Sequence, residues 1–132
     1  MILEILNDLV TQLAAALGVT VVKGFPDWAR PALAPPLAAL EITGWLPSTN
    51  RIGQRQARQT ASFRFWVFAR QEPELCTLLD SLTTWSAATN AANINSRIVD
   101  LALTDGQRHT PETPAQQEQH AFLFTLTASW SG

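Results

Sequence analysis

The sequence predicts an α+β fold, a single mainly antiparallel β-sheet with two helices packed on one face, in the order α-β-β-β-α-β-β. Three observations favour this fold. Residues 60–70 alternate between apolar and polar side chains with a period of two, as a strand does. Residues 72–85 then change to apolar positions spaced by three and four, which is the pattern of an amphipathic helix. Residues 3–17 repeat that helical pattern, so two helices each offer one apolar stripe to the sheet.

The N-terminal helix is predicted over residues 3–17, and Gly18 supplies its C-terminal stop. Residues 19–23 are rich in β-branched side chains and predict a short strand. Four prolines in residues 24–36 exclude both a regular helix and a hydrogen-bonded ladder. We expect an ordered loop there, because it carries the apolar anchors Phe25, Trp28 and Leu33.

A second strand is predicted over residues 37–43, with Ala38, Leu40 and Ile42 on its inner face. The segment 44–59 is polar and interrupted by glycine, and it is interpreted as a long loop. Loops of this length without secondary structure tend to be functional or mobile.

The strand over residues 60–70 is expected to lie at the centre of the sheet. Phe63 and Phe65 share one face and are predicted to be core residues. Trp66 and Phe68 lie on the other face, where a solvated sheet would carry polar side chains. We therefore expect that face to be covered as well, either by a neighbouring subunit or by the long loops of the chain.

The chain after the second helix is predicted to hold two more strands. Residues 91–96 are interpreted as a polar turn leading into a strand over 97–104, with Val99, Leu101 and Leu103 on one side. Residues 105–118 are interpreted as a loop. The last strand covers 120–130, and one of its sides is apolar throughout: Phe122, Phe124, Leu126, Ala128 and Trp130.

Composition sets the broad class of the protein. A length of 132 residues predicts one domain, 1–132. The 15% of charged residues is low and suggests surface buried in an assembly, and the net charge of −2 argues against nucleic acid as the main partner. A single cysteine, no basic leader and no long apolar run predict a soluble intracellular protein without a disulfide or a membrane span.

The sequence carries no pattern of catalytic, metal-binding or cofactor-binding residues. His109 and His120 flank a proline-containing loop at a spacing that suits no familiar metal site. Cys76 lies near a helix start without a histidine placed to act as its base, so a partly buried structural thiol is expected. Glycine-rich phosphate loops and the Gly-x-Ser-x-Gly motif are missing from the sequence. We expect no enzyme, no metal and no cofactor.

Tryptophan and arginine are the residue types most enriched at the centres of protein interfaces. Trp85 and Trp130 fall on core positions of their elements. The other three tryptophans lie in or beside loops or on the second face of the sheet. The arginine cluster lies in a loop, and it is better suited to binding a neighbouring protein than to binding nucleic acid. The interface candidates are Trp28, Trp45, Arg51, Arg55, Arg58, Trp66 and Phe68.

The arrangement of the chain resembles the phage tail-terminator, or tail-completion, proteins related to the lambda minor tail protein U. The likeness consists of an N-terminal helix, the strand–proline loop–strand stretch VTVVKGFPDWARPALAPPLAALEI, a long arginine-bearing loop, the strand ASFRFWVFAR, the helix PELCTLLDSLTTW and two final strands. It covers nearly the whole chain and includes no motif from which a functional residue can be transferred.

That resemblance implies a structural protein without a catalytic site or cofactor. Members form a ring, usually a hexamer, that caps the tail tube and presents a surface to the head connector. The implied partners are copies of the chain itself, the tail tube protein and the head–tail connector proteins. The implied location is the host cytoplasm during assembly and then the virion tail.

Two other interpretations stay open. The chain is also compatible with a ferredoxin-like α+β enzyme or small-ligand-binding domain, with a pocket between sheet and helices. The third interpretation, after that one, is another neck or baseplate component of a phage tail.

Overall fold

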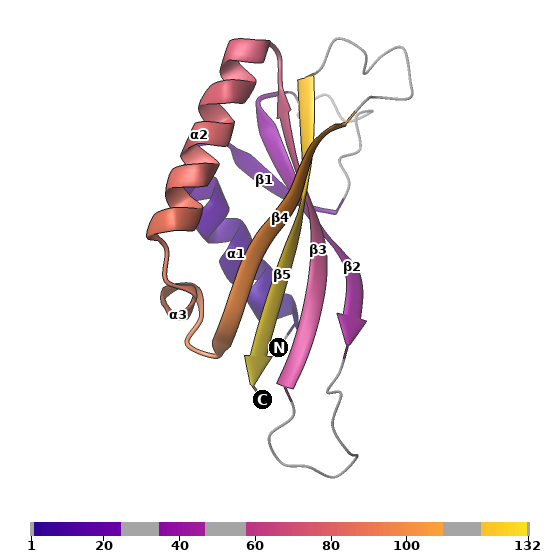
Figure 1. Ribbon diagram of the computed structural model, residues 1–132, viewed down its shortest axis with the longest axis vertical. Coiled ribbons are helices and arrows are strands. Elements are labelled where there is room, and N and C mark those ends of the chain that lie inside the picture. Colours follow the sequence, from indigo (N-terminus) through magenta and orange to yellow (C-terminus); the bar gives the residue numbers. More distant parts are fainter. Residues whose placement is uncertain (1, 25–34, 47–57, 110–119, 132) are drawn as a thin grey trace.

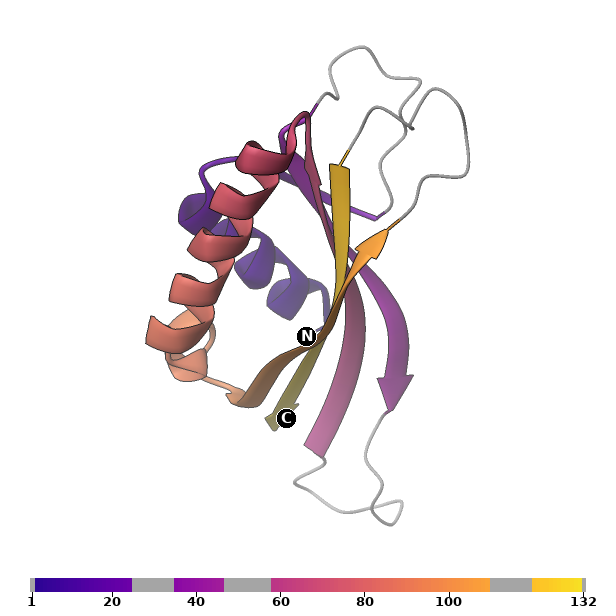
Figure 2. The same cartoon turned by 45° about the horizontal axis from the view of Figure 1, so that its top comes forward.

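A computed structural model describes residues 2–24, 35–46, 58–109 and 120–131. Five strands form one sheet in the order β1-β2-β3-β5-β4. Two long helices lie on the same face of that sheet, as Figures 1 and 2 show, so the predicted α+β fold is confirmed. The elements in chain order are α1 (Ile2–Leu17), β1 (Thr20–Lys23), β2 (Leu37–Leu46), β3 (Arg58–Ala69), α2 (Glu72–Ala88), α3 (Ala91–Ile94), β4 (Ile98–His109) and β5 (His120–Ser131).

Both long helices follow their predicted apolar stripes. In α1 the stripe faces the core, with Ile2, Leu6 and Val10 only partly buried at its margin. The helix ends at Gly18, whose φ of 68° is accessible to glycine at little cost. In α2 Pro73 occupies the first turn, where a missing N–H leaves no bond unmade, and Glu72 and Glu74 lie at the positive end of the helix dipole. The buried stripes are Ile5, Leu9, Leu13 and Leu17 in α1 and Leu75, Leu78, Leu82 and Trp85 in α2.

The main core lies between these helices and one face of the sheet. Phe63 and Phe65 are fully buried there, as predicted. Trp130, Leu126 and Ala128 contribute from β5 on the same face, again as predicted. Burial of these large apolar side chains is the principal source of stability for a domain of this size.

The opposite face of the sheet carries a second, smaller core. Trp66 and Phe68 are 4% and 3% exposed and pack with Leu37, Ala39 and Ala121. Trp66 and Phe68 are therefore covered, as expected, and they are buried already in a single copy of the chain. The C-terminal half of β3 is apolar on both faces, because both faces are covered there, whereas Arg64, earlier on the second face, is exposed.

One strand pairing differs from the expected antiparallel arrangement. β1 runs parallel to β2, with Thr20 opposite Leu37 and Lys23 opposite Leu40. A parallel pair needs a connection of about a dozen residues or more, and the thirteen residues 24–36 supply that length.

Several predicted loops and turns are shorter than expected, because strands continue into polar sequence. β2 extends to Leu46 and β3 begins at Arg58, so only the middle of the predicted loop 44–59 lies outside the described residues. β4 continues to His109 and so includes the first five residues of the predicted loop 105–118. The predicted turn 91–96 contains the helical turn α3, where the Asn90 side chain accepts a hydrogen bond from Ala92 N at 3.0 Å.

Two apolar side chains are exposed although the sequence placed Ile42 on an inner face and Val99 on the same side of its strand as Leu101 and Leu103. Val99 is 55% exposed, because the ladder is irregular between Ile98 and Asp100 and Ile98 takes the buried position. Ile42 is 39% exposed, because β1 covers β2 only as far as Leu40. Both corrections concern the open edges of the sheet.

We predict that Phe65→Ala lowers the free energy of unfolding by about 3–5 kcal/mol, because it leaves a cavity in a close-packed core. Chemical denaturation followed by circular dichroism measures this change. Leu3→Ala is the control, since Leu3 is exposed on α1 and its loss should cost less than about 0.5 kcal/mol. Equal effects of the two substitutions would show that the assignment of the core face is wrong.

Candidate functional site

The interface candidates from the sequence do not come together in one place. Trp66 and Phe68 are buried in the second core, whereas Trp45 is 51% exposed near the end of β2. Trp28, Arg51 and Arg55 lie outside the described residues. Arg58 begins β3, but its side chain is likewise outside the described part of the chain. Of the described candidates, Trp45 alone offers a large apolar surface to a partner.

Trp45 belongs to a strip of exposed apolar side chains on β2. Its indole N–H donates to Gln59 Oε1 at 3.2 Å, which holds the ring beside β3. Leu46, the next residue, is 53% exposed, and Ile42, three positions before Trp45, is also exposed. Among the described residues, the exposed large apolar side chains are Leu3, Ile42, Trp45, Leu46 and Val99. We call residues 41–46 the open segment of β2, because β1 pairs with β2 only up to Leu40.

β4 forms the opposite edge of the sheet along its full length. Its ladder with β5 is interrupted between Thr104 and Gln107, where Asp105 has a φ of 59°. Gly106 suits this position, because a Cβ here would lie 2.6 Å from Phe124 Cε1 and would displace that ring. The bulge divides β4 into a regular stretch, residues 100–104, and a displaced C-terminal end.

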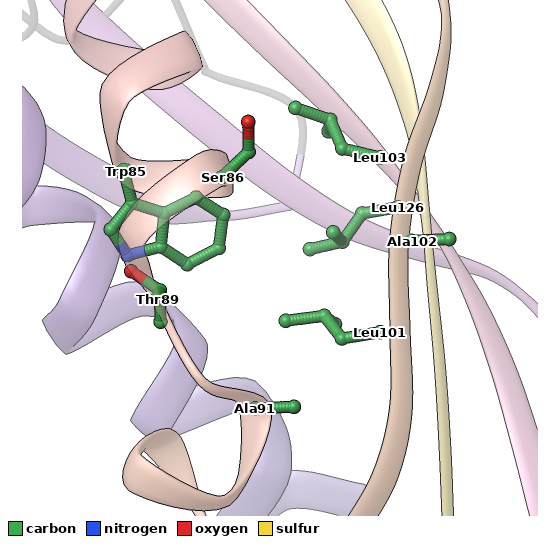
Figure 3. A pocket seen from close by; sticks show the side chains of 8 residues that line it. All are labelled: Trp85, Ser86, Thr89, Ala91, Leu101, Ala102, Leu103 and Leu126. Carbon is green, nitrogen blue, oxygen red and sulfur yellow. The ribbon is translucent and has the colours of Figure 1, made fainter.

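A cavity of about 350 Å³ lies between α2 and the β4 edge. In Figure 3 the indole of Trp85 faces Leu101, Leu103 and Leu126 across this space. It reaches the surface, since its lining residues Ser86 and Ala102 are exposed. The complete lining is Trp85, Ser86, Thr89, Ala91, Leu101, Ala102, Leu103 and Leu126.

The chemistry of that lining is apolar with two hydroxyl groups. None of the lining side chains is a carboxylate, imidazole, amine or thiol, so they supply no general acid or base of the usual kinds. Apolar side chains therefore share the lining with polar groups, and the cavity is suited to a group that is only partly apolar. Within the described part of the chain, no group of three His, Cys, Asp or Glu residues is placed to hold a metal ion.

A cluster of ionisable residues lies elsewhere, at the start of α2. Glu72 accepts hydrogen bonds from Arg108 on β4 and from His120 Nδ1 at 3.0 Å. His120 begins β5, as the predicted strand over 120–130 has it, and joins this cluster. Cys76 is exposed, contrary to the expected partly buried thiol. The Glu72 cluster ties the second helix to the two last strands, which is a structural role.

The Arg108 hydrogen bond is the main reason why the pKa of Glu72 lies below its ordinary value, and His120 adds to the effect. Glu74 also has a lowered pKa, mainly because the backbone N–H of Arg70 donates to its carboxylate at 3.0 Å. Both carboxylates stabilise the folded state in their ionised form.

No helix in the described part of the chain is long and apolar enough to cross a membrane.

We predict that the fold loses stability in acid through Glu72. A lowered folded-state pKa gives stability that is present above the unfolded-state pKa and is lost as the pH falls through the folded-state pKa. The free energy of unfolding should thus decrease as the pH falls below about 4.5, the ordinary pKa of a glutamate. Glu72→Gln should flatten this decrease more than Glu4→Gln, an exposed carboxylate on α1. Identical pH profiles for the two variants would contradict the assigned role.

Comparison with known proteins identifies a fold and no family. No family model matches the sequence, and no curated protein sequence matches it. Among solved structures, the chain is similar to a chain in the virion of a native gene transfer agent (GTA) particle, with a TM-score of 0.55 and 16% identity. The match covers 91% of this chain and 84% of that chain. At this identity the likeness shows that the two chains share a fold.

Proposed function

We propose that this protein is a structural subunit of a phage-like particle, and that it acts as a tail terminator. In this role, identical subunits form a ring, possibly a hexamer, that caps the tail tube and joins it to the head connector. The observation that carries the proposal is the fold shared with a chain of a gene transfer agent virion, over most of both chains.

The surface of the subunit supports a role based on contact. The side chains that line the cavity include no carboxylate, imidazole, amine or thiol, and its two hydroxyl groups belong to Ser86 and Thr89. Large apolar side chains are instead exposed on both open edges of the sheet, Trp45 and Leu46 on β2 and Val99 on β4. Exposed edges of this kind promote association unless a partner covers them. A structural subunit needs such partners, whereas a monomeric enzyme has to avoid them.

The candidate residues then divide by role. Trp45 is assigned to contact between subunits, because it is exposed on an open strand edge. Arg51, Arg55 and Arg58, together with Trp28, are proposed to contact the tail tube or the connector. Trp66 and Phe68 are buried within the chain and are assigned to the stability of the subunit.

A small-ligand-binding domain is the second candidate function, favoured by the cavity of about 350 Å³ between sheet and helices. Cavities of about 150 Å³ already accept a benzene ring, so this space can hold a small apolar molecule. Native mass spectrometry separates the two functions. A monomer carrying a bound small molecule would favour the ligand-binding domain.

We predict that the purified protein forms a closed ring, which multi-angle light scattering detects as one multiple of the 14.5 kDa chain mass. The ring should persist on moderate dilution, because a structural ring needs stable interfaces. A monomer at every concentration would contradict the ring.

We also predict that particles assembled without this chain carry tail tubes of irregular length that fail to join heads. Electron microscopy of such particles measures both tube length and head attachment. Restoring the wild-type chain is the control. Tubes of normal length that are joined to heads would contradict the terminator role, even if the purified protein forms a ring.

A further inference from the structure

The two open edges of the sheet lie at the same level. Residues opposite one another can be followed across the ladders from β2 through β3 and β5 to β4. Leu46 of β2 shares a row with Asp100 of β4, and Glu41 shares a row with Thr104. The open segment of β2 therefore occupies the same five rows as the regular stretch 100–104 of β4, with Thr43 as an extra residue at the irregularity between Ile42 and Gly44.

The remaining parts of both edges are also complementary in shape. β1 adds a strand beside Leu37–Leu40, so the β2 edge steps outward at that level. The β4 ladder is interrupted at Asp105 and Gly106, opposite Phe124, which shares a row with Leu40. A bulge bends an edge strand away from its line. If the two edges were placed side by side, β1 would lie beside the displaced end of β4, which bends away at that row.

We propose that the open segment of β2 pairs antiparallel with residues 100–104 of β4 in a second copy of this chain, and that Trp45 enters the cavity beneath α2 of that copy. The proposal rests on the ring of the proposed function and adds the location of its interface. Strand direction is suitable: three successive antiparallel pairings separate β2 from β4, so the two edges run in opposite directions.

Matching rows bring apolar side chains together on the helix-bearing face. Trp45 lies opposite Ala61 and Ile42 opposite Phe63, and both partners belong to the main core. In the proposed contact Trp45 would meet Leu101 and Ile42 would meet Leu103, because these residues share their rows. Leu101 and Leu103 line the cavity opposite Trp85 (Figure 3). An indole ring from the neighbour would fill this apolar space.

The opposite face raises no electrostatic objection. Its rows would place Leu46 beside Asp100, Gly44 beside Ala102, and Glu41 beside Thr104, so no two like charges face each other. A slip by one residue would turn every side chain to the wrong face. The apolar pattern therefore favours this register over its immediate neighbours.

We identify the partner as a second copy of this chain, because each copy carries both matching edges, the open segment of β2 and residues 100–104 of β4. Two different edges meet, so the contact is heterologous, and repeating it generates a ring if the rotation closes and a filament if it does not. Pairing also satisfies the backbone N–H and C=O groups that both edges leave open, which is how a sheet recruits a further strand.

Cysteine cross-linking tests the register directly. In a Cys76→Ser background, which removes the exposed native thiol, Gly44→Cys and Ala102→Cys are made as separate variants. A Cβ at Gly44 would make ordinary contact with Ser62 Cβ at 3.7 Å, so the substitution fits. Directly opposed Cβ atoms in an antiparallel pair are about 4.5–5.5 Å apart, close enough for efficient cross-linking. Mixing the two variants under mild oxidation should give a disulfide-linked dimer, and neither variant alone should give one.

The matched control is Gly44→Cys mixed with Thr104→Cys, which is on the same face but two residues away from Ala102. Its yield should be several-fold lower. Equal yields from the two mixtures, or efficient cross-linking of either variant with itself, would overturn the register. A ring seen by light scattering without the Gly44–Ala102 link would overturn this inference and leave the proposed function in place. Open filaments that carry the link would support the interface and contradict the ring.

Trp45→Ala tests the occupant of the cavity. If the indole fills the neighbour's cavity, its loss should weaken association by about thirtyfold or more, as for other buried aromatic anchors. Leu3→Ala is the control, since Leu3 is also exposed and apolar but lies on α1. Analytical ultracentrifugation measures both, and circular dichroism confirms that each variant is folded. An unchanged association constant for Trp45→Ala would overturn the role given to this residue.

Discussion

The packing of β3 holds the molecule together. Its side chains enter the main core on one face, through Phe63 and Phe65, and the second core on the other, through Trp66 and Phe68. Its backbone pairs with β2 on one side and β5 on the other. Residues that share a row across β3 and β5 point to the same face, so the large core side chains of both strands lie on the face that α1 and α2 cover.

A central β3 also determines where the sheet is incomplete. The order β1-β2-β3-β5-β4 leaves β4 at one edge, while the short β1 covers only part of β2 at the other. Natural sheets protect such edges with bulges, charges or partners. Here β4 has a bulge at Asp105 and Gly106 and β2 has an irregularity between Ile42 and Gly44. The exposed Ile42, Trp45 and Leu46 of the open segment are nevertheless apolar, and residues 100–104 of β4 are regular. These edges are the part of the molecule that an assembly would cover.

The sequence predicted best those elements whose own side chains reveal their surroundings. The stripes of residues 3–17 and 72–85 and the alternation of residues 60–70 are local patterns, and the corresponding helices and strand are present. The C-terminal end of β4 was missed, because Gln107, Arg108 and His109 pair through their backbone with β5 and their side chains give no strand signal. The strand β1 was predicted, but its parallel pairing was not, because strand direction depends on the partner strand and is not encoded in the local pattern.

The candidate site was predictable only in part. Trp45 was selected by residue type and context, and its exposure agrees with a contact role, but nothing local distinguished it from Trp66, which is buried. The cavity could not be predicted, because Trp85 and Leu101 face each other only after α2 has packed over the sheet. The matching rows of Trp45 and Leu101 likewise depend on four strands in register. No alternation within a single strand contains that information.

Amide hydrogen exchange across a dilution series tests most directly whether the open edges of the sheet complete one another. In the assembled state, the amides of residues 41–46 and 100–104 that point away from their own sheet should be protected, because each would donate to the neighbouring copy. On dilution to the monomer both segments should lose protection together, while β3 remains protected. Rapid exchange of both segments in the assembled state would contradict the account.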